Sequence, residues 1–235
     1  MTDQPRQAMV IVAHPDDAEF TVAGTVARWA RDGLEVIYVI CTDGSRGSND
    51  PSIGPPAMVA IRKAEQDAAA QVLGVKEVVY LGYEDGTLEP TLSLRRDLTR
   101  VIRRYRPDVV ICADPTRRFH GDGYLSHPDH RAGGGAALDA VFPSAGTRYI
   151  FPELLAEGLE PHDVKEVYVH GHSEPNHWVD ISDTIEIKIA ALQQHKSQVG
   201  DWEGLAEGIR DWAQEAGSSQ GMAYAESFKR IVLGQ

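Results

Sequence analysis

The sequence predicts an α/β fold built on a mainly parallel sheet. Four short apolar segments recur in the first half of the chain, and segments with helical periodicity separate them. The apolar segments do not alternate with polar residues, which is typical of parallel strands covered on both faces. Helical crossovers between such strands are right-handed. The expected architecture is therefore Rossmann-like and doubly wound, with helices on both faces of the sheet.

The four strands are expected at residues 8–13, 35–42, 77–82 and 108–114. Three helices are expected between them, at residues 20–32, 57–73 and 92–105. Gly33 and Gly74 follow the first two helices, and glycine favours the end of a helix. The third helix stops just before Pro107, a residue that cannot continue it.

The pattern becomes less regular after residue 114. Residues 115–125 are polar and contain glycine, so a loop is expected there. Residues 129–141 predict a helix in spite of three consecutive glycines, and residues 142–161 predict irregular structure. Two further strands, at residues 165–170 and 177–181, are interpreted as a pair at the sheet edge.

The C-terminal part is expected to be helical. Residues 182–198 predict an amphipathic helix that starts with a capping motif, and two short helices are expected between residues 205 and 232. No internal repeat or linker is visible, so residues 1–235 are expected to form one domain.

Composition excludes several classes of function. The chain has 23 Lys and Arg against 35 Asp and Glu, a net charge of −12, which argues against binding to nucleic acid or to an anionic membrane surface. Cys41 and Cys112 lie in apolar segments and are expected to be buried free thiols. No signal peptide and no apolar run of membrane-spanning length is visible, so we expect a cytoplasmic protein without a membrane anchor.

Polar residues follow the predicted strands. In open α/β sheets, ligands bind beyond the carboxyl ends of the strands. His14-Pro15-Asp16-Asp17 follows the first strand, Arg46 follows the second, Asp85 follows the third, and His127-Pro128-Asp129-His130 lies beyond the fourth. The first turn lacks the glycine fingerprint of a dinucleotide site, so no nicotinamide or flavin cofactor is expected.

The HPDD and HPDH segments together predict a metal site. Each contains two potential ligands three residues apart, which one turn of backbone can direct to one point. A few nitrogen and oxygen ligands with open coordination positions are typical of catalytic Zn²⁺. Ordinary loop residues and helix caps are the alternative for either segment alone. The spacing does not decide whether Asp16 or Asp17 binds the metal.

The pair AHPDDAEF and HPDH resembles the PIG-L/LmbE-like family of zinc-dependent N-deacetylases. That family includes N-acetylglucosaminyl-phosphatidylinositol de-N-acetylases and the deacetylases of mycothiol and bacillithiol biosynthesis. The resemblance covers most of the chain, including TDGSRGS, LGYEDGTL, DISDTIEIKIAALQQHKSQ and YAESFKRI. It implies a Rossmann-like fold and removal of an N-acetyl group with the help of a metal.

The resemblance also implies roles for individual residues. It implies three metal ligands, His14, Asp17 and His130. Asp16 matches the general base, and His127 matches a histidine that supports the tetrahedral intermediate, with Asp129 as its orienting partner. Zn²⁺ lowers the pKa of bound water to about 7. Fe²⁺, Co²⁺ or Mn²⁺ can substitute for it at such a ligand set.

Substrate contacts are expected from four residues, Arg46, Asp85, Tyr124 and His195. Arg46 suits a hydroxyl, carboxylate or phosphate, with a solvated loop arginine as the alternative. Asp85 resembles an aspartate that binds sugar hydroxyls, or it forms a turn with its following glycine. Tyr124 differs in spacing from the tyrosine of some relatives. His195 lines the pocket or packs within its helix.

Other polar and aromatic residues are expected to be structural. Arg62 and Glu65 are three residues apart on a helix and favour an ion pair with each other. Five other histidines are expected to have no catalytic role: His120, His162, His170, His172 and His177. Trp202 and Trp212 are expected to pack between helices, with the border of the pocket as an alternative.

The expected function is removal of an acetyl or similar acyl group from a water-soluble amino-sugar conjugate, giving acetate and a free amine. One alternative is an amidase that acts on a non-sugar compound or a thiol S-conjugate. Another is a ligand-binding module that keeps the metal without turnover. Ser45 stands where many relatives have an acidic residue, so the substrate does not transfer directly from the thiol-biosynthesis members. Neither a nucleic acid nor a membrane is an expected partner, and a homo-oligomer is compatible with the sequence.

Overall fold

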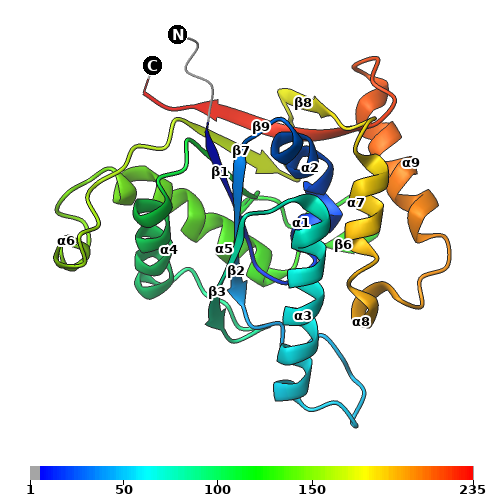
Figure 1. Ribbon diagram of the computed structural model, residues 1–235, viewed down its shortest axis with the longest axis horizontal. Coiled ribbons are helices and arrows are strands. Elements are labelled where there is room, and N and C mark those ends of the chain that lie inside the picture. The colour runs from blue at the N-terminus through cyan, green and yellow to red at the C-terminus, as the bar shows by residue number, and fades with distance from the viewer. Residues whose placement is uncertain (1–5, 235) are drawn as a thin grey trace.

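The computed structural model describes residues 6–234 and has a mainly parallel sheet at its centre. The strands lie in the order β3-β2-β1-β4-β7-β9-β8 (Figure 1). Five of them are parallel: β1 (Gln7–Val12), β2 (Glu35–Thr42), β3 (Glu77–Tyr83), β4 (Val109–Ala113) and β7 (Glu166–His170). The predicted Rossmann-like class is therefore confirmed.

Helices cover both faces of the sheet (Figure 1). One face carries α1 (Asp17–Thr21), α2 (Ala23–Arg31), α3 (Pro55–Leu73), α7 (Ile185–Leu192), α8 (Lys196–Val199) and α9 (Leu205–Ser218). The other carries α4 (Leu92–Tyr105), α5 (Pro128–Asp139) and α6 (Glu153–Ala156). Successive residues of β1 enter two separate cores, since Val10 joins the first and Met9 and Ile11 the second. Both faces of this strand are thus buried.

The antiparallel edge differs from the prediction. β8 (His177–Asp180) does not pair with β7, because β9 (Ala225–Val232) lies between them and pairs with both. The expectation of two short helices after residue 205 is therefore half wrong: α9 forms, but residues 225–232 are a strand. Ala225, Phe228 and Val232 have helical spacing, yet Phe228 is fully buried beside the Tyr168 ring of β7. The open edge of β7 decides the conformation of this segment.

Two predicted helices are interrupted. The helix expected at residues 20–32 starts earlier and divides at Val22, whose φ of −131° separates α1 from α2. The helix expected at residues 182–198 begins at Ile185 and divides after Leu192, so that His195 precedes α8. In contrast, α4 has the predicted bounds.

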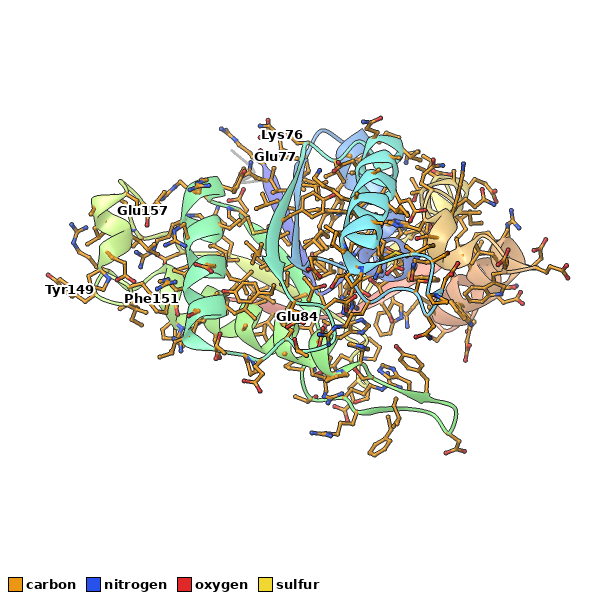
Figure 2. All side chains as sticks on the ribbon, turned by 90° about the horizontal axis from the view of Figure 1, so that it is seen from below. Lys76, Glu77, Glu84, Tyr149, Phe151 and Glu157 are labelled. Carbon is orange, nitrogen blue, oxygen red and sulfur yellow. The ribbon has the colours of Figure 1, made fainter. Side chains whose placement is uncertain are left out.

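Two segments expected to be irregular contain short elements. A hairpin of β5 (Phe119–His120) and β6 (Tyr124–Leu125) forms within the predicted loop, and it projects from the body of the molecule in Figure 2. A π-helical turn, η1 (Ala140–Ala145), follows α5. No helix within residues 6–234 is both long and apolar enough to cross a bilayer.

Candidate active site

A cavity of about 1240 Å³ lies where the parallel strands end. Its wall includes residues that follow β1, β2 and β3 and residues at the ends of β4 and β7. Eight of the ten residues predicted to form the site line it: His14, Asp16, Asp17, Arg46, Asp85, Tyr124, His127 and His130. Asp129 and His195 lie outside this lining. The carboxyl edge of the sheet is thus the candidate site, as the sequence predicts.

The turn after β1 is shaped by a left-handed residue. Asp16 has a φ of 91°, a conformation that side chains rarely adopt and that is often found at functional sites. Its backbone NH donates to Gln66 Oε1 at 3.0 Å. The backbone NH of His14 donates to Asp17 Oδ2 at 2.8 Å, which fixes the first carboxylate of α1 against the turn. These bonds direct the side chains of His14, Asp16 and Asp17 into the cavity.

The His14 imidazole is surrounded by three carboxylates. Its Nδ1 lies 3.5 Å from Asp17 Oδ2, and its Nε2 lies 3.1 Å from Asp85 Oδ1 and 3.2 Å from Asp129 Oδ2. Burial alone would lower the pKa of His14, but the charge of Asp17 and hydrogen bonds to the carboxylates raise that pKa to about 12. The carboxylates around His14 therefore strongly favour a positive charge at this point, whether a proton on the imidazole or a bound cation carries it.

Asp17 connects the two motifs. Its Oδ1 lies 3.0 Å from Nε2 of His130, which α5 brings to the cavity from the other side of the sheet. Burial would raise the pKa of Asp17, yet the charges of His130 and His14 hold it well below the usual range. The three ligands implied by the family resemblance thus meet around one carboxylate.

The donor atoms fit a divalent cation. Within residues 6–234, two groups of three side chains have ligand atoms that all lie within 4.8 Å of one another: His14, His127 and His130, and His14, Asp85 and Asp129. Imidazole nitrogens combined with carboxylate oxygens are the ligands of many catalytic zinc and iron sites. The two groups share His14, which makes this residue the centre of the candidate metal site.

Asp16 has different surroundings from Asp17. Its Oδ2 lies 3.2 Å from Nη2 of Arg62, and the residue is 8% exposed. Burial raises the pKa of Asp16 to about 7, although the Arg62 charge opposes the rise. The ion pair predicted between Arg62 and Glu65 is wrong: Arg62 donates to the Pro15 carbonyl and to Asp16, while Glu65 accepts from Ser197. Arg62 thus belongs to the site.

His195 supports the site from within the core. Its Nε2 lies 3.2 Å from Glu19 Oε2, and the side chain is fully buried. Glu19 in turn accepts from Gln66, the residue that also binds the Asp16 backbone. The prediction that His195 contacts substrate is corrected accordingly, because the helix break after Leu192 turns this histidine toward α1 instead of the cavity.

Asp129 pairs with His14 more closely than with His127. Its carboxylate lies 3.8 Å from His127 Nδ1, too far for a hydrogen bond, and accepts from the backbone NH groups of Gly86 and Leu88. His127 Nδ1 instead accepts from the Asp129 backbone NH at the start of α5. Burial and the charge of His14 lower the pKa of His127. The expected Asp129–His127 carboxylate–imidazole bond is therefore replaced by one to His14.

The residues expected to contact substrate differ in exposure. Asp85 is 5% exposed, and it accepts from the Arg46 backbone NH at 3.0 Å. Burial would raise its pKa, but the hydrogen bond to His14 lowers that pKa to about 2. The Arg46 guanidinium is half exposed and pairs with Glu84, which Figure 2 labels. Tyr124 stands on the projecting hairpin and is 55% exposed.

Several residues that line the cavity or hold its groups were not predicted from the sequence. Gln66 and Arg62 lie one helical turn apart on α3, a spacing that could have indicated one shared face. His170 was assigned no catalytic role, although it is the last residue of β7 and thus lies at the ligand-binding edge of the sheet. Trp212 lines the cavity from α9, which agrees with the alternative that the sequence offered for this residue.

Comparisons with known proteins show which sequences this chain resembles. The family model for PIG-L, described as GlcNAc-PI de-N-acetylase, matches residues 9–141. Diacetylchitobiose deacetylase of Thermococcus kodakarensis is 33% identical over 96% of this chain and 83% of that protein. A probable N-acetyl-alpha-D-glucosaminyl L-malate deacetylase 2 of Bacillus anthracis is 29% identical, over 82% of this chain and 81% of that protein.

A solved structure extends the similarity to the fold. N,N'-diacetylchitobiose deacetylase from Pyrococcus horikoshii, complexed with its inhibitor MPG, superposes with a TM-score of 0.90 at 34% identity. The similarity covers 97% of this chain and 85% of that one. The matching family model includes both the HPDD and the HPDH segments. The chain is therefore a member of the PIG-L family.

Proposed function

We propose that this protein is a metal-dependent hydrolase that removes an N-acetyl group from an amino-sugar-containing small molecule. The products are acetate and a free amine. The observation that carries the proposal is the contact of Asp17 with both His14 and His130, beside the buried carboxylate of Asp16. The similarity to deacetylases of N-acetylglucosamine compounds supports the same reaction.

We assign His14, Asp17 and His130 as ligands of one divalent cation, with Zn²⁺ as the preferred ion and Fe²⁺, Co²⁺ or Mn²⁺ as substitutes. Nδ1 of His14 faces Asp17, and Asp85 and Asp129 lie at its Nε2. A carboxylate on the outer nitrogen of a ligating histidine orients the ring and increases its basicity. Asp129 therefore acts in this proposal as a support for His14.

A divalent cation would supply acidified water and polarise the amide carbonyl. Asp16 accepts the proton from the attacking water, and its raised pKa suits proton transfer near neutral pH. His127 lines the same cavity and donates to the developing oxyanion through its Nε2, since its Nδ1 is held by the backbone. The amine nitrogen receives its proton from Asp16 or from His127 as the C–N bond breaks.

Three further residues are proposed to bind the substrate: Arg46, Asp85 and Tyr124. Asp85 offers an ionised carboxylate to sugar hydroxyls at the metal side of the cavity. Arg46 and Tyr124 lie on opposing loops, after β2 and on the hairpin, and can order around a bound sugar. The substrate in this proposal is an N-acetylated amino-sugar conjugate, and residues 1–235 act as one deacetylase domain.

The test compares metal content with acetate release for single variants. Asp16→Asn is expected to keep stoichiometric metal and to lose about 100-fold or more in kcat for acetate release from N,N'-diacetylchitobiose. His14→Ala and His130→Ala are expected to lose both metal and turnover. Asp183→Asn, at an exposed carboxylate just before α7, serves as the matched control and should resemble the unaltered protein.

Two results would overturn parts of the proposal. Near-normal turnover of Asp16→Asn would show that another group is the base. Metal binding by the unaltered protein without acetate release from N-acetylglucosamine, N,N'-diacetylchitobiose or other acetylated amino sugars would instead favour a ligand-binding module.

A further inference from the structure

We propose that Phe20, Trp202 and Trp212 form a second sugar-binding subsite next to the metal centre. In this arrangement they bind the hexose ring that is linked to the ring undergoing deacetylation. The inference rests on the proposed function and makes it more specific, because it names the residues that discriminate between a disaccharide and a free monosaccharide.

The three aromatic rings form a continuous strip. The centroids of Phe20 and Trp202 are 6.2 Å apart, and those of Trp202 and Trp212 are 6.0 Å apart. Phe20 lies on α1, three residues after Asp17, and Trp212 lies on α9. Phe20 and Trp212 line the same cavity as His14 and Asp16. The strip therefore begins on the helix that carries a proposed metal ligand and extends away from it.

The two tryptophans remain accessible. Trp202 is 44% exposed and Trp212 is 52% exposed. Trp29, in contrast, packs edge-on against Tyr168 under the first core. A helix-packing role explains Trp29 but leaves the large exposed faces of Trp202 and Trp212 without a function.

The cavity is larger than one sugar ring requires. Its volume of about 1240 Å³ exceeds the roughly 300–1,000 Å³ that usually holds a drug-sized ligand. A pyranose ring has an apolar face of C–H groups and a rim of hydroxyls, so it fits an aromatic surface with polar neighbours. Gln198 and Glu215 line this same cavity and provide such neighbours.

Hydrogen bonds connect the segment that carries Trp202 to the turn that carries Arg46. Gln198 on α8 donates to the Gly47 carbonyl in the turn that carries Arg46. The backbone NH of Trp202, just after α8, donates to the carbonyl of Val199 at the end of that helix. Both tryptophans lie beyond residues 9–141, the part that the family model matches. The reacting groups thus come from the segment that the family model matches, and the two tryptophans come from the C-terminal segment.

The test measures discrimination between a disaccharide and a monosaccharide. We compare kcat/KM for acetate release from N,N'-diacetylchitobiose and from N-acetylglucosamine. The ratio of the two values is expected to fall about tenfold in Trp212→Ala and Trp202→Ala, and Trp212→Phe should restore most of it. Trp178→Ala is the matched control, because Trp178 on β8 lines a separate cavity together with residues at the amino ends of β1 and β2, and its ratio should not change.

Binding separates this inference from the proposed reaction. Calorimetry with N,N'-diacetylchitobiose and the Asp16→Asn variant should give an affinity that Trp212→Ala lowers. Should no acetate be released while this tryptophan-dependent binding persists, the proposed reaction fails and the subsite stands. An unchanged ratio, or an altered oligomeric mass in the tryptophan variants without any change in sugar discrimination, would overturn the subsite.

A separate observation points to His170 as a positioning residue for the metal ligands. We infer that its imidazole supports Asp17 and His130 through one buried water molecule. His170 Nε2 is buried and has no hydrogen-bond partner within residues 6–234. A cavity of about 30 Å³ is lined by His170, Asp17 and His130. That volume suffices for one water, and the site is polar enough to hold it.

Metal affinity tests this second inference directly. His170→Leu is expected to raise the dissociation constant for Zn²⁺ about tenfold or more, measured by competition with a chelator, because supporting partners of ligands commonly contribute that much. His170→Gln keeps a polar group and should restore part of the affinity. His172→Gln, outside both cavities, is the control. Unchanged affinity in a folded His170→Leu protein would overturn the assignment.

Discussion

Asp16 and Asp17 are neighbours in the chain, yet their carboxylates have opposite electrostatic surroundings. Burial raises the pKa of Asp16, whereas two imidazoles lower the pKa of Asp17. The left-handed backbone of Asp16 separates the two side chains, one toward Arg62 and the other toward His14 and His130. Two adjacent acids with divergent pKa values suit one base and one ligand.

The surroundings of Asp16 predict how activity depends on pH. A general base works only when it is deprotonated, so kcat/KM should fall as the pH falls through the pKa of Asp16. Arg62 lowers that pKa, and Arg62→Met should therefore shift the acidic limb of the profile to higher pH. Arg62→Lys keeps the charge and should show a smaller shift. An acidic limb at the same pH in Arg62→Met would contradict the assignment.

At the scale of elements, α5 depends on a glycine for its distance from the sheet. A Cβ at Gly134 would lie 2.2 Å from the carbonyl oxygen of Ala113 on β4, closer than real atoms approach. Gly134 lies one turn after His130 on the same helix. The close approach of α5 to β4 therefore determines where the His130 imidazole meets Asp17.

A pair of glycine variants tests this dependence. Gly134→Ala should force α5 outward, lower the free energy of unfolding by about 1–3 kcal/mol and weaken Zn²⁺ binding. Gly135→Ala is the matched control, since its Cβ would meet only Pro115 at 3.7 Å. A helical Gly→Ala change without a clash should stabilise by about 0.4–1 kcal/mol. If titration gave the two variants equal affinity for Zn²⁺, the position of His130 would not depend on the close approach of α5 to β4.

At the scale of the whole molecule, β9 joins the C-terminal end of the chain to the first helices. Glu226 on β9 accepts from the backbone NH groups of Gly24 and Thr25 on α2, and it pairs with Lys188 of α7 at 2.6 Å. Both charged side chains are about 5% exposed. Removing one partner would leave a buried charge without compensation.

The buried pair predicts a large loss of stability on substitution. Glu226→Gln should lower the free energy of unfolding by about 3 kcal/mol, as measured by urea denaturation. The exposed pair of Glu186 and Arg210 provides the control, and Glu186→Gln should cost less than about 1 kcal/mol. If Glu226→Gln lowered the free energy of unfolding as little as Glu186→Gln does, the Glu226–Lys188 pair would not hold β9 to the helices.

Local patterns predicted much of the fold and the chemistry of the site. The strand at 35–42 and the helix at 92–105 were predicted with their observed bounds, because their hydrophobic patterns alone determine them. β9 was missed because its conformation depends on the open edges of β7 and β8. Likewise, the bond between Asp129 and His14 joins residues 115 positions apart, and no sequence spacing indicates it.

The position of the bound metal tests the assignment of His14, Asp17 and His130 as ligands most directly. A crystal of the Zn²⁺-loaded protein, measured at the zinc absorption edge, should show one anomalous peak about 2.0–2.2 Å from ligand atoms of His14, Asp17 and His130. The carboxylate of Asp16 should lie beside that ion without binding it. A peak coordinated by His14, Asp85 and Asp129, or no ordered peak in the cavity, would contradict the proposed metal site and the reaction derived from it.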